Sequence, residues 1–295
     1  MATKLALAFS LLISSLLIAE EITGKNWLAK IDGETSIHEL HLPGTHNTAA
    51  LLEPLPGTAQ CQSLTIQQQL EAGVRFLDIR CRHVSDRFEL YHGPISQEQN
   101  FSEFHQTLED FLTNNPTECV LVSIQETANA NLNTRTFTQT FASYQTQKPK
   151  LWHLKTTLPQ LSEVRGKAIL VRRFKSPKPL GIDATNWRSK DLHVSPLLLI
   201  QDKFKIKDLA DKWQAINKLW NATPRHKKRL ALNFTSGYQP NKIGIPNITT
   251  VSNFINPRLK ESLSTQPAPP PGILILDFID AELSSDIYQL NFANP

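Results

Sequence analysis

Polar side chains stand at the carboxyl ends of most apolar runs in this chain. These endings are His46 with Asn47, Asp78 with Arg80, His92, Gln125 with Glu126, Arg172 with Arg173, Asp202, and Asp277. In a β/α barrel the carboxyl ends of the strands converge on one face, where such folds place their chemistry. The repeated pattern predicts one site that combines histidines, arginines and carboxylates.

This set of side chains suits cleavage of a phosphodiester by a neighbouring hydroxyl group. One imidazole removes the hydroxyl proton, and a second gives a proton to the leaving oxygen. A guanidinium binds the phosphoryl oxygens in bidentate fashion as charge builds on them. A hydroxyl on the substrate itself gives the reaction an intramolecular advantage. The sequence contains no HExxH, GxSxG, P-loop or strand-linked GxGxxG motif that would favour another chemistry.

The elements that must position these residues form an alternating pattern. Strand-like runs occur at 37–42, 74–80, 87–91, 119–125, 168–173, 196–201, 230–235 and 273–277. Several are continuously apolar, as buried parallel strands are. Amphipathic helix patterns lie between most of them, including 102–114 with Ser102 as its N-cap, and 206–220. The run at 87–91 follows the previous one too closely for an intervening helix. We predict an α/β fold, a single irregular (β/α)8 TIM-like barrel over residues 25–295.

Composition agrees with one globular domain. The chain has 295 residues, of which 40% are hydrophobic and 20% charged, and its net charge of +4 is mild. This charge gives no reason to expect a nucleic-acid partner, and the basic run at 225–229 is typical of a solvated loop, with an anionic membrane surface as the alternative. The three cysteines lack CxxC spacing, which disfavours a metal site built from them. One disulfide with a free thiol and three buried thiols both remain open.

The amino terminus predicts export. Residues 1–19 combine Lys4 with an apolar run too short for a membrane span, which is typical of a signal peptide, although an uncleaved anchor is the alternative. We therefore expect a secreted, extracellular protein. Sequons for N-glycosylation, which would make it a glycoprotein, occur at Asn100, Asn221, Asn233 and Asn247. Asn233 lies in an apolar strand pattern and is discounted.

A set of ordered motifs carries a family resemblance. The motifs are PGTHNT, FLDIRCR, LYHGP, LVRRF, LIQDKFK, LNFTS and ILDF, spread over about residues 35–280. In this order they resemble the bacterial-type phosphatidylinositol-specific phospholipase C family, with its X-domain fold. The resemblance implies an enzyme that cleaves phosphatidylinositol, or glycosyl-phosphatidylinositol anchors, at a membrane surface. Its products would be diacylglycerol and a cyclic inositol phosphate, and it would act as a monomer without metal or other cofactor.

The resemblance also implies roles for four catalytic residues. His46 would be the general base that takes the proton of the inositol 2-hydroxyl, and Asp277 would hold its working tautomer. His92 would be the general acid for the diacylglycerol oxygen. Arg80 would bind the phosphate, with Asp78 supporting it.

Other positions would bind the head group. Arg173 and Asp202 would hydrogen-bond inositol hydroxyls, contacts that reject substrates lacking them. Arg172 is expected to face the other way on the same strand. Phe204 stands where the family usually has a tyrosine that stacks on the ring. Glu126 could be a surface carboxylate or a site residue.

Two positions depart from the bacterial pattern. Asn47 stands where bacterial members usually have an aspartate that assists the general acid, and it resembles the asparagine that binds metal in calcium-dependent relatives. Gln125 stands where bacterial members tend to have lysine and the calcium enzymes an acidic ligand. We assign both to substrate binding. Arg80 favours the metal-independent mode, because the metal enzymes have a carboxylate at that position.

Two alternatives come from other functional classes. One is a related phosphodiesterase with another head group or with Ca²⁺ dependence. The other is a catalytically weak lipid-binding protein, for which the changes at Asn47 and Gln125 are the only support. The loops 51–60 and 236–247 carry apolar side chains that could either enter a membrane interface or pack within the loops.

Overall fold

The computed structural model describes residues 21–127, 130–187, 192–226, 228–265 and 272–292. The predicted signal peptide at 1–19 lies outside these ranges. Among the described helices, none has the length and apolar character that a membrane span requires.

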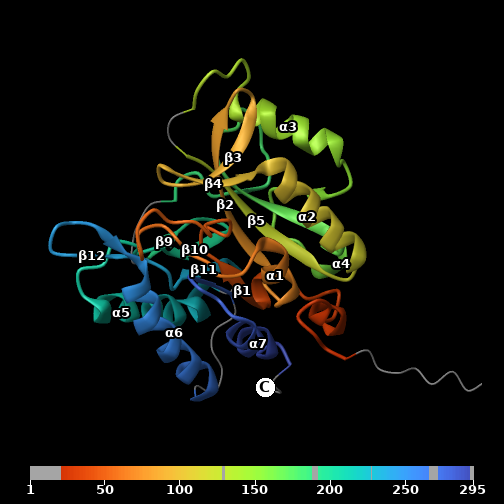
Figure 1. The fold of residues 1–295 in the computed structure, drawn as a ribbon. Helices are drawn as coiled ribbons and strands as arrows, with labels where there is room; N and C mark the ends of the chain where they lie inside the picture. The colour runs from red at the N-terminus through yellow and green to blue at the C-terminus, as the bar shows by residue number, and fades with distance from the viewer. Residues whose placement is uncertain (1–20, 128–129, 188–191, 227, 266–271, 293–295) are drawn as a thin grey trace, which may run out of the picture.

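A curled sheet forms the centre of the molecule (Figure 1). Its strands follow the order β6-β7-β5-β2-β1-β14-β11-β10-β9. The parallel strands are β1 (His41–Thr45), β2 (Phe76–Val84), β5 (Cys119–Glu126), β6 (Trp152–His153), β7 (Lys167–Arg173), β8 (Ile182–Asp183), β10 (Leu198–Gln201), β11 (Leu230–Phe234) and β14 (Gly272–Leu276). Most of these strands were predicted from their apolar runs, and the α/β barrel-like class is confirmed.

The structure corrects the predicted barrel at two places. The run at 87–91 is β3 (Arg87–His92), which pairs antiparallel with β2 and with β4 (Ile95–Asn100) and is not a parallel strand of the barrel. In the described residues the sheet also stays open. The neighbour of β10 at one edge is the short antiparallel strand β9 (His193–Val194), and the neighbours of β7 at the other edge are β6 and β8. Two further short strands, β12 (Gln239–Pro240) and β13 (Pro246–Asn247), form a separate ribbon.

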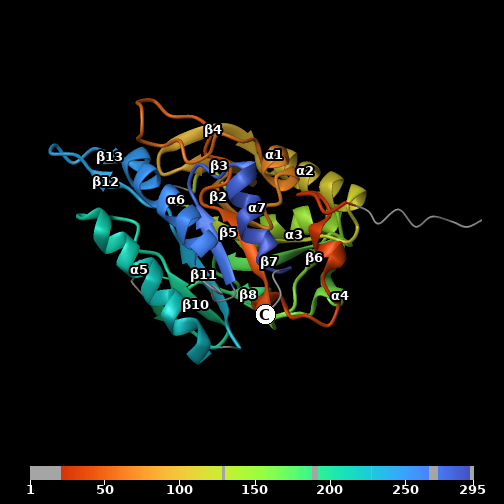
Figure 2. The same cartoon turned by 90° about the horizontal axis from the view of Figure 1, so that it is seen from below.

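Helices lie around the outside of the curled sheet (Figure 2). They are α1 (Ile66–Glu71), α2 (Phe101–Asn114), α3 (Phe137–Gln147), α4 (Leu161–Val164), α5 (Leu209–Ala222), α6 (Ile248–Thr265) and α7 (Ala281–Gln289), with 3-10 turns at Trp27–Lys30, Ile37–Glu39 and Thr223–His226. The predicted N-cap of α2 was wrong. Asn100, not Ser102, caps this helix, because its side chain accepts a hydrogen bond from the backbone of Glu103.

Alternate strand residues pack into two cores. On β5, Val120, Val122 and Ile124 join the cluster shared with the outer helices, whereas Leu121 joins the cluster inside the curled sheet. This period of two follows from the alternating direction of side chains along a strand. The apolar runs of the sequence are therefore buried on both faces, which fixes the strand ends in space.

The cysteines resolve the alternative left open by the sequence. Cys61, Cys81 and Cys119 are all free and buried. Burial raises the pKa of the Cys119 thiol to about 12 and those of the other two well above their ordinary value. They are neutral packing groups at physiological pH.

Candidate active site

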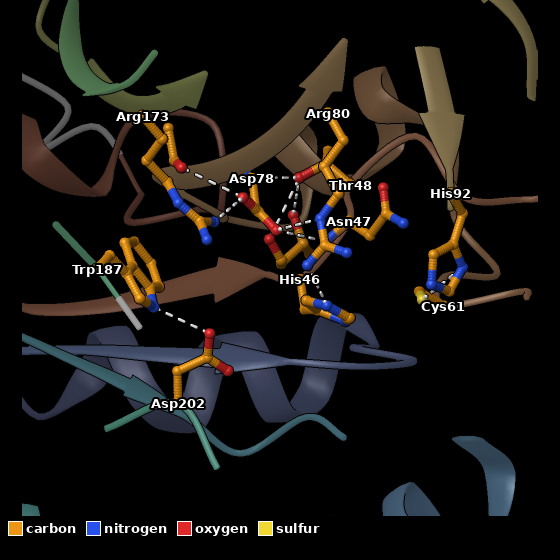
Figure 3. A network of polar contacts seen from close by, with 12 residues as sticks. His46, Asn47, Thr48, Cys61, Asp78, Arg80, His92, Arg173, Trp187 and Asp202 are labelled. Atoms are coloured by element: carbon orange, nitrogen blue, oxygen red, sulfur yellow. Dashed lines mark hydrogen bonds and ion pairs between the residues drawn. The ribbon is translucent and has the colours of Figure 1, made fainter. Parts of the chain in front are cut away.

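A cavity of about 310 Å³ opens at the carboxyl ends of the strands. All predicted site residues except Asn47 and Asp277 line it, and Figure 3 shows most of them in close-up. The lining residues are His46, Thr58, Arg80, His92, Gln125, Arg173, Asp202, Phe204, Gly237, Tyr238, Pro246 and Ile248. The convergence expected from the strand endings is therefore present.

His46 follows β1 and is held in one orientation. Its backbone N–H donates to the carbonyl of Leu276 at 2.9 Å, and its Nδ1 lies 2.7 Å from Asp277 Oδ1. Asp277 is buried behind the cavity, where its other carboxylate oxygen accepts from the Gly237 N–H at 3.2 Å. Because a carboxylate only accepts, the proton lies on Nδ1, and Nε2 keeps a lone pair. This is the tautomer that a general base requires.

Asp78 organises the two arginines of the site (Figure 3). Its carboxylate lies 3.2 Å from Arg80 Nε and 3.2 Å from Arg173 Nη1. Burial by itself would raise the pKa of Asp78, but Arg80 and Arg173 lower it to about 2. One anion thus holds two cations at the cavity wall, where a guanidinium group can bind phosphate oxygens in bidentate fashion.

Arg80 connects this cationic wall to the base. Its Nη2 lies 2.7 Å from Nε2 of His46, so the guanidinium donates to the lone pair of the imidazole. A phosphate oxygen that enters beside Arg80 would accept the hydrogen bond that Nη2 now donates to His46. The base nitrogen would then become available to a substrate hydroxyl.

His92 faces His46 from the end of β3. The two ring centroids lie 6.4 Å apart with the rings nearly perpendicular. Nδ1 of His92 lies 2.5 Å from the carbonyl oxygen of Ala59. Burial, assisted by the charge of Arg80, lowers the pKa of His92 to about 4, although the bond to Ala59 acts in the opposite direction. The two imidazoles therefore have different partners and can take different roles, one as base and one as acid.

A tryptophan that the sequence pattern did not indicate, Trp187, lies behind Arg173 and Asp202 without lining the cavity itself. Arg173 lies over the Trp187 ring, 3.7 Å from its centroid, and Trp187 Nε1 donates to Asp202 Oδ2 at 2.9 Å. The indole thus fixes both polar groups predicted to bind the head group. Trp187 follows β8 in a loop, and its position in the sequence gave no strand-end signal.

The remaining lining residues differ in exposure. Phe204 is 40% exposed at the cavity mouth, with its ring centroid 6.1 Å from that of Tyr238, so an apolar face is present where a stacking ring was predicted. Gln125 lines the cavity, and its buried Oε1 has no hydrogen-bond partner among the described residues. This amide is available to a polar ligand.

Asn47, predicted to bind substrate, lies next to His46 without lining the cavity. Its side chain is 1% exposed and does not line the cavity, and its φ of 40° lies in the left-handed region that asparagine tolerates. Its backbone N–H donates to Asp78 Oδ2 at 3.2 Å. The buried Nδ2 of its side chain has no hydrogen-bond partner among the described residues, so substrate binding by Asn47 stays a prediction.

Two further strand-end residues face away from the cavity. Nη2 of Arg172 lies 2.6 Å from Oδ2 of Asp183, and the guanidinium also donates to the carbonyls of Phe174 and Leu180. These contacts agree with its predicted direction away from the cavity. Glu126, for which two interpretations were open, is not among the lining residues, and burial raises its pKa.

The residues beside Asn47 do not fit a calcium ion. Calcium takes six to eight oxygen ligands. The carboxylate next to Asn47 is Asp78, and both of its oxygens are bound to guanidinium groups. His46, Cys61 and Asp277 do place possible ligand atoms within 4.8 Å of one another. A thiol is a poor ligand for calcium, and Nδ1 of His46 already shares its hydrogen bond with Asp277.

Comparison with known proteins identifies this architecture. Residues 43–174 match the model of the family "Phosphatidylinositol-specific phospholipase C, X domain". Over these residues the chain is similar to the X domain of this family. Among its X-domain relatives, the 1-phosphatidylinositol phosphodiesterase of Listeria monocytogenes is 27% identical over 94% of this chain and 88% of its own length. The enzyme of the same name from Staphylococcus aureus is 25% identical over 86% of this chain and 88% of its own.

Solved structures of X-domain phospholipases share the fold. The Listeria monocytogenes enzyme superposes with a TM-score of 0.77 at 22% identity, covering 91% of this chain and 99% of that one. A Staphylococcus aureus structure, from work on modulation of its membrane binding, gives a TM-score of 0.80 at 22% identity, with coverage of 91% and 98%. The resemblance drawn from the motifs and the barrel-like class predicted from the strand pattern are confirmed.

Proposed function

We propose that this protein is a phosphatidylinositol-specific phospholipase C. In this proposal the inositol 2-hydroxyl attacks the phosphorus of the same lipid and expels diacylglycerol, leaving a cyclic inositol phosphate. The observation that carries the proposal is the pair of histidines that lines one cavity together with Arg80, of which His46 contacts both Arg80 and Asp277. The names of the bacterial relatives support the same substrate.

In this proposal each catalytic group has its own role. Nε2 of His46 takes the hydroxyl proton, while its Nδ1–H keeps the bond to Asp277, which stabilises the imidazolium that forms. The N–H of Arg80 that donates to His46 in this structure donates instead to a phosphoryl oxygen as negative charge builds there. Nε2 of His92 gives its proton to the glycerol oxygen that leaves. The general base and acid each contribute on the order of 10²–10⁴-fold.

The cavity suits the head group and leaves the lipid tails outside. A volume of about 310 Å³ admits a phosphorylated cyclitol, and Arg173 and Asp202, both bound to Trp187, provide donors and acceptors for its hydroxyls. The acyl chains would remain in a membrane surface against the rim, where Leu52, Leu55 and Ile243 are exposed. Glycosyl-phosphatidylinositol anchors present the same head group and are a second substrate in this proposal.

The proposed reaction uses protein side chains and no metal. Arg80 and Arg173 supply the positive charge that a divalent cation would otherwise bring to the phosphate. We also propose that the protein acts outside the cell as a monomer, which rests on the signal-peptide pattern of residues 1–19 and on a site built from one chain.

Product analysis on phosphatidylinositol vesicles tests this function. We expect a cyclic inositol phosphate by phosphorus NMR in the presence of a chelator, at a rate that added calcium does not raise. His46→Ala should lower turnover by at least about 10²-fold while leaving vesicle binding intact. Activity only with calcium would contradict the metal-free mechanism. No product under either condition would favour another head group or a lipid-binding protein.

A further inference from the structure

The loop that follows the His46 turn is held by one carboxylate. Glu53 accepts hydrogen bonds from the backbone N–H groups of Gly57 at 2.9 Å, Gln60 at 3.2 Å and Ala59 at 3.4 Å. A carboxylate that accepts several backbone N–H bonds fixes the path of the chain around it. Glu53 thereby sets the position of the peptide groups on either side of Ala59.

The far end of this loop is attached to the base side of the site. The Cys61 carbonyl accepts from the Phe278 N–H at 2.7 Å, one residue after Asp277, and the Cys61 N–H donates to the carbonyl of Ala50 at 2.9 Å. Nε2 of Gln62 donates to the carbonyls of His46 and Leu276, each at 2.9 Å. These hydrogen bonds therefore attach the loop to the strand ends that carry the general base and its aspartate.

Between these two anchors the loop presents the Ala59 carbonyl to His92. The distance from this oxygen to Nδ1 of His92 is 2.5 Å, whereas Sγ of Cys61 is 3.8 Å away. The charged and titratable groups whose fields act on His92 are Arg80, His46 and Asp277. No carboxylate is hydrogen-bonded to the His92 ring among the described residues, and Asn47 provides an amide where bacterial relatives were expected to have an acid.

We propose that the Ala59 carbonyl, held in place by Glu53, orients His92 for proton donation, and that Glu53 is a positioning residue for the general acid. The proposal rests on the role given to His92 in the proposed function. With Nδ1–H bound to Ala59, Nε2 is the nitrogen left to carry the proton that is donated. Glu53 does not line the cavity and acts only through the loop.

Kinetics of Glu53 variants test the proposal. We expect Glu53→Ala to lower kcat about tenfold, less than loss of the acid itself, with KM changed less than about twofold because the head-group contacts remain. Glu53→Gln keeps one acceptor oxygen for the three backbone N–H donors, and its kcat should lie between those of the unmodified protein and Glu53→Ala. Glu98→Ala removes an exposed glutamate of β4 and is the matched control. It should keep kcat within about twofold of the unmodified protein.

The pH profile gives a signature that a general loss of structure would not produce. The Ala59 bond raises the pKa of His92, so its loss should lower that pKa further. His92 acts in its protonated form, which a bound phosphate favours because it neutralises the charge of Arg80 that lowers the His92 pKa. The value of kcat then falls as pH rises through the pKa that His92 has in the substrate complex. The alkaline limb of kcat should therefore move to lower pH in Glu53→Ala.

Nitrogen-15 NMR on the unmodified protein tests the hydrogen bond without any change of fold. Neutral His92, assigned by the loss of its signals in His92→Gln, should be the Nδ1–H tautomer. The Nε2–H tautomer would overturn the proposal, as would an unchanged kcat and pH profile in Glu53→Ala. If instead His92→Ala retained full activity, the proposed function would fail, and the inference with it.

Discussion

At the scale of single residues, the site depends on a buried anion that does not line the cavity. Asp78 holds Arg80 and Arg173, accepts from Ser123 Oγ and the Asn47 N–H, and is fully buried. A buried charge is tolerated only when it is paired and hydrogen-bonded. Asp78 therefore links the stability of the fold to the position of the cations.

We expect Asp78→Asn to lower kcat/KM by at least about tenfold, because both guanidinium groups lose the anion that orients them. It should also change the pH dependence of stability. The pKa of Asp78 in the folded protein, about 2, lies below its ordinary value of 3.8. Its stabilisation is thus present above pH 4 and is lost as pH falls from 4 toward 2. Urea unfolding at several pH values measures this loss.

The variant should lose less stability than the unmodified protein over this acid range. Asp110→Asn, at an exposed position of α2, is the matched control and should keep the dependence of the unmodified protein. Equal acid sensitivity in Asp78→Asn and the unmodified protein would show that the ion pairs do not stabilise the fold.

At the scale of elements, the residue at which a helix begins depends on side-chain contacts that the sequence pattern alone does not identify. For α2 the sequence has two candidate N-caps, Asn100 and Ser102. Asn100 has extended backbone and completes a capping box with Glu103, while the helix has already begun at Phe101. The end of β4 and the start of α2 therefore meet at Asn100, which fixes how this helix leaves the hairpin that carries His92.

Asn100→Ala should destabilise the protein by about 1 kcal/mol, the usual effect of removing an N-cap. Ser102→Ala should change the unfolding free energy by less than about 0.5 kcal/mol, because an exposed position inside a helix favours alanine. Chemical denaturation of the two variants compares them directly. A larger loss for Ser102→Ala would contradict the observed helix start.

At the scale of the whole molecule, the fold gathers two distant loops around the cavity mouth. Thr58 belongs to loop 51–60, and Tyr238 and Pro246 to loop 236–247, and all three line the cavity. The Ile248 N–H donates to the Gly57 carbonyl at 2.8 Å, which connects the two loops. Their exposed apolar residues therefore form one rim around the site. Such a rim fits a membrane surface that presents the lipid head group.

We expect Leu55→Ser with Ile243→Ser to weaken binding to phosphatidylinositol vesicles at least tenfold, since each apolar side chain taken out of water contributes on the order of 1.5–3 kcal/mol. Sedimentation with vesicles measures the change, and kcat on a short-chain soluble substrate should stay the same. Val194→Ser removes an exposed apolar group from β9, beside the start of β10, and is the control. If vesicle binding is unchanged in the double variant, the rim does not enter the membrane.

The sequence by itself determined the strands and the chemistry at their ends. Continuous apolar runs predicted β5, β7, β11 and β14, because strands buried on both faces require them. A polar residue directly after such a run lies at the carboxyl edge of a parallel sheet. This rule alone predicted that His46, Arg80, Arg173 and Asp202 would lie together, and all four line one cavity.

Only the tertiary structure decided the partners of these groups. Trp187 and Ala59 contact the site from loops, and a carbonyl oxygen has no signature in the sequence at all. The antiparallel course of β3, the open edge of the sheet and the burial of Asn47 also depend on long-range packing. Local patterns record which faces are apolar, whereas hydrogen-bond partners far apart in the chain are set when the sheet curls and brings the loops together.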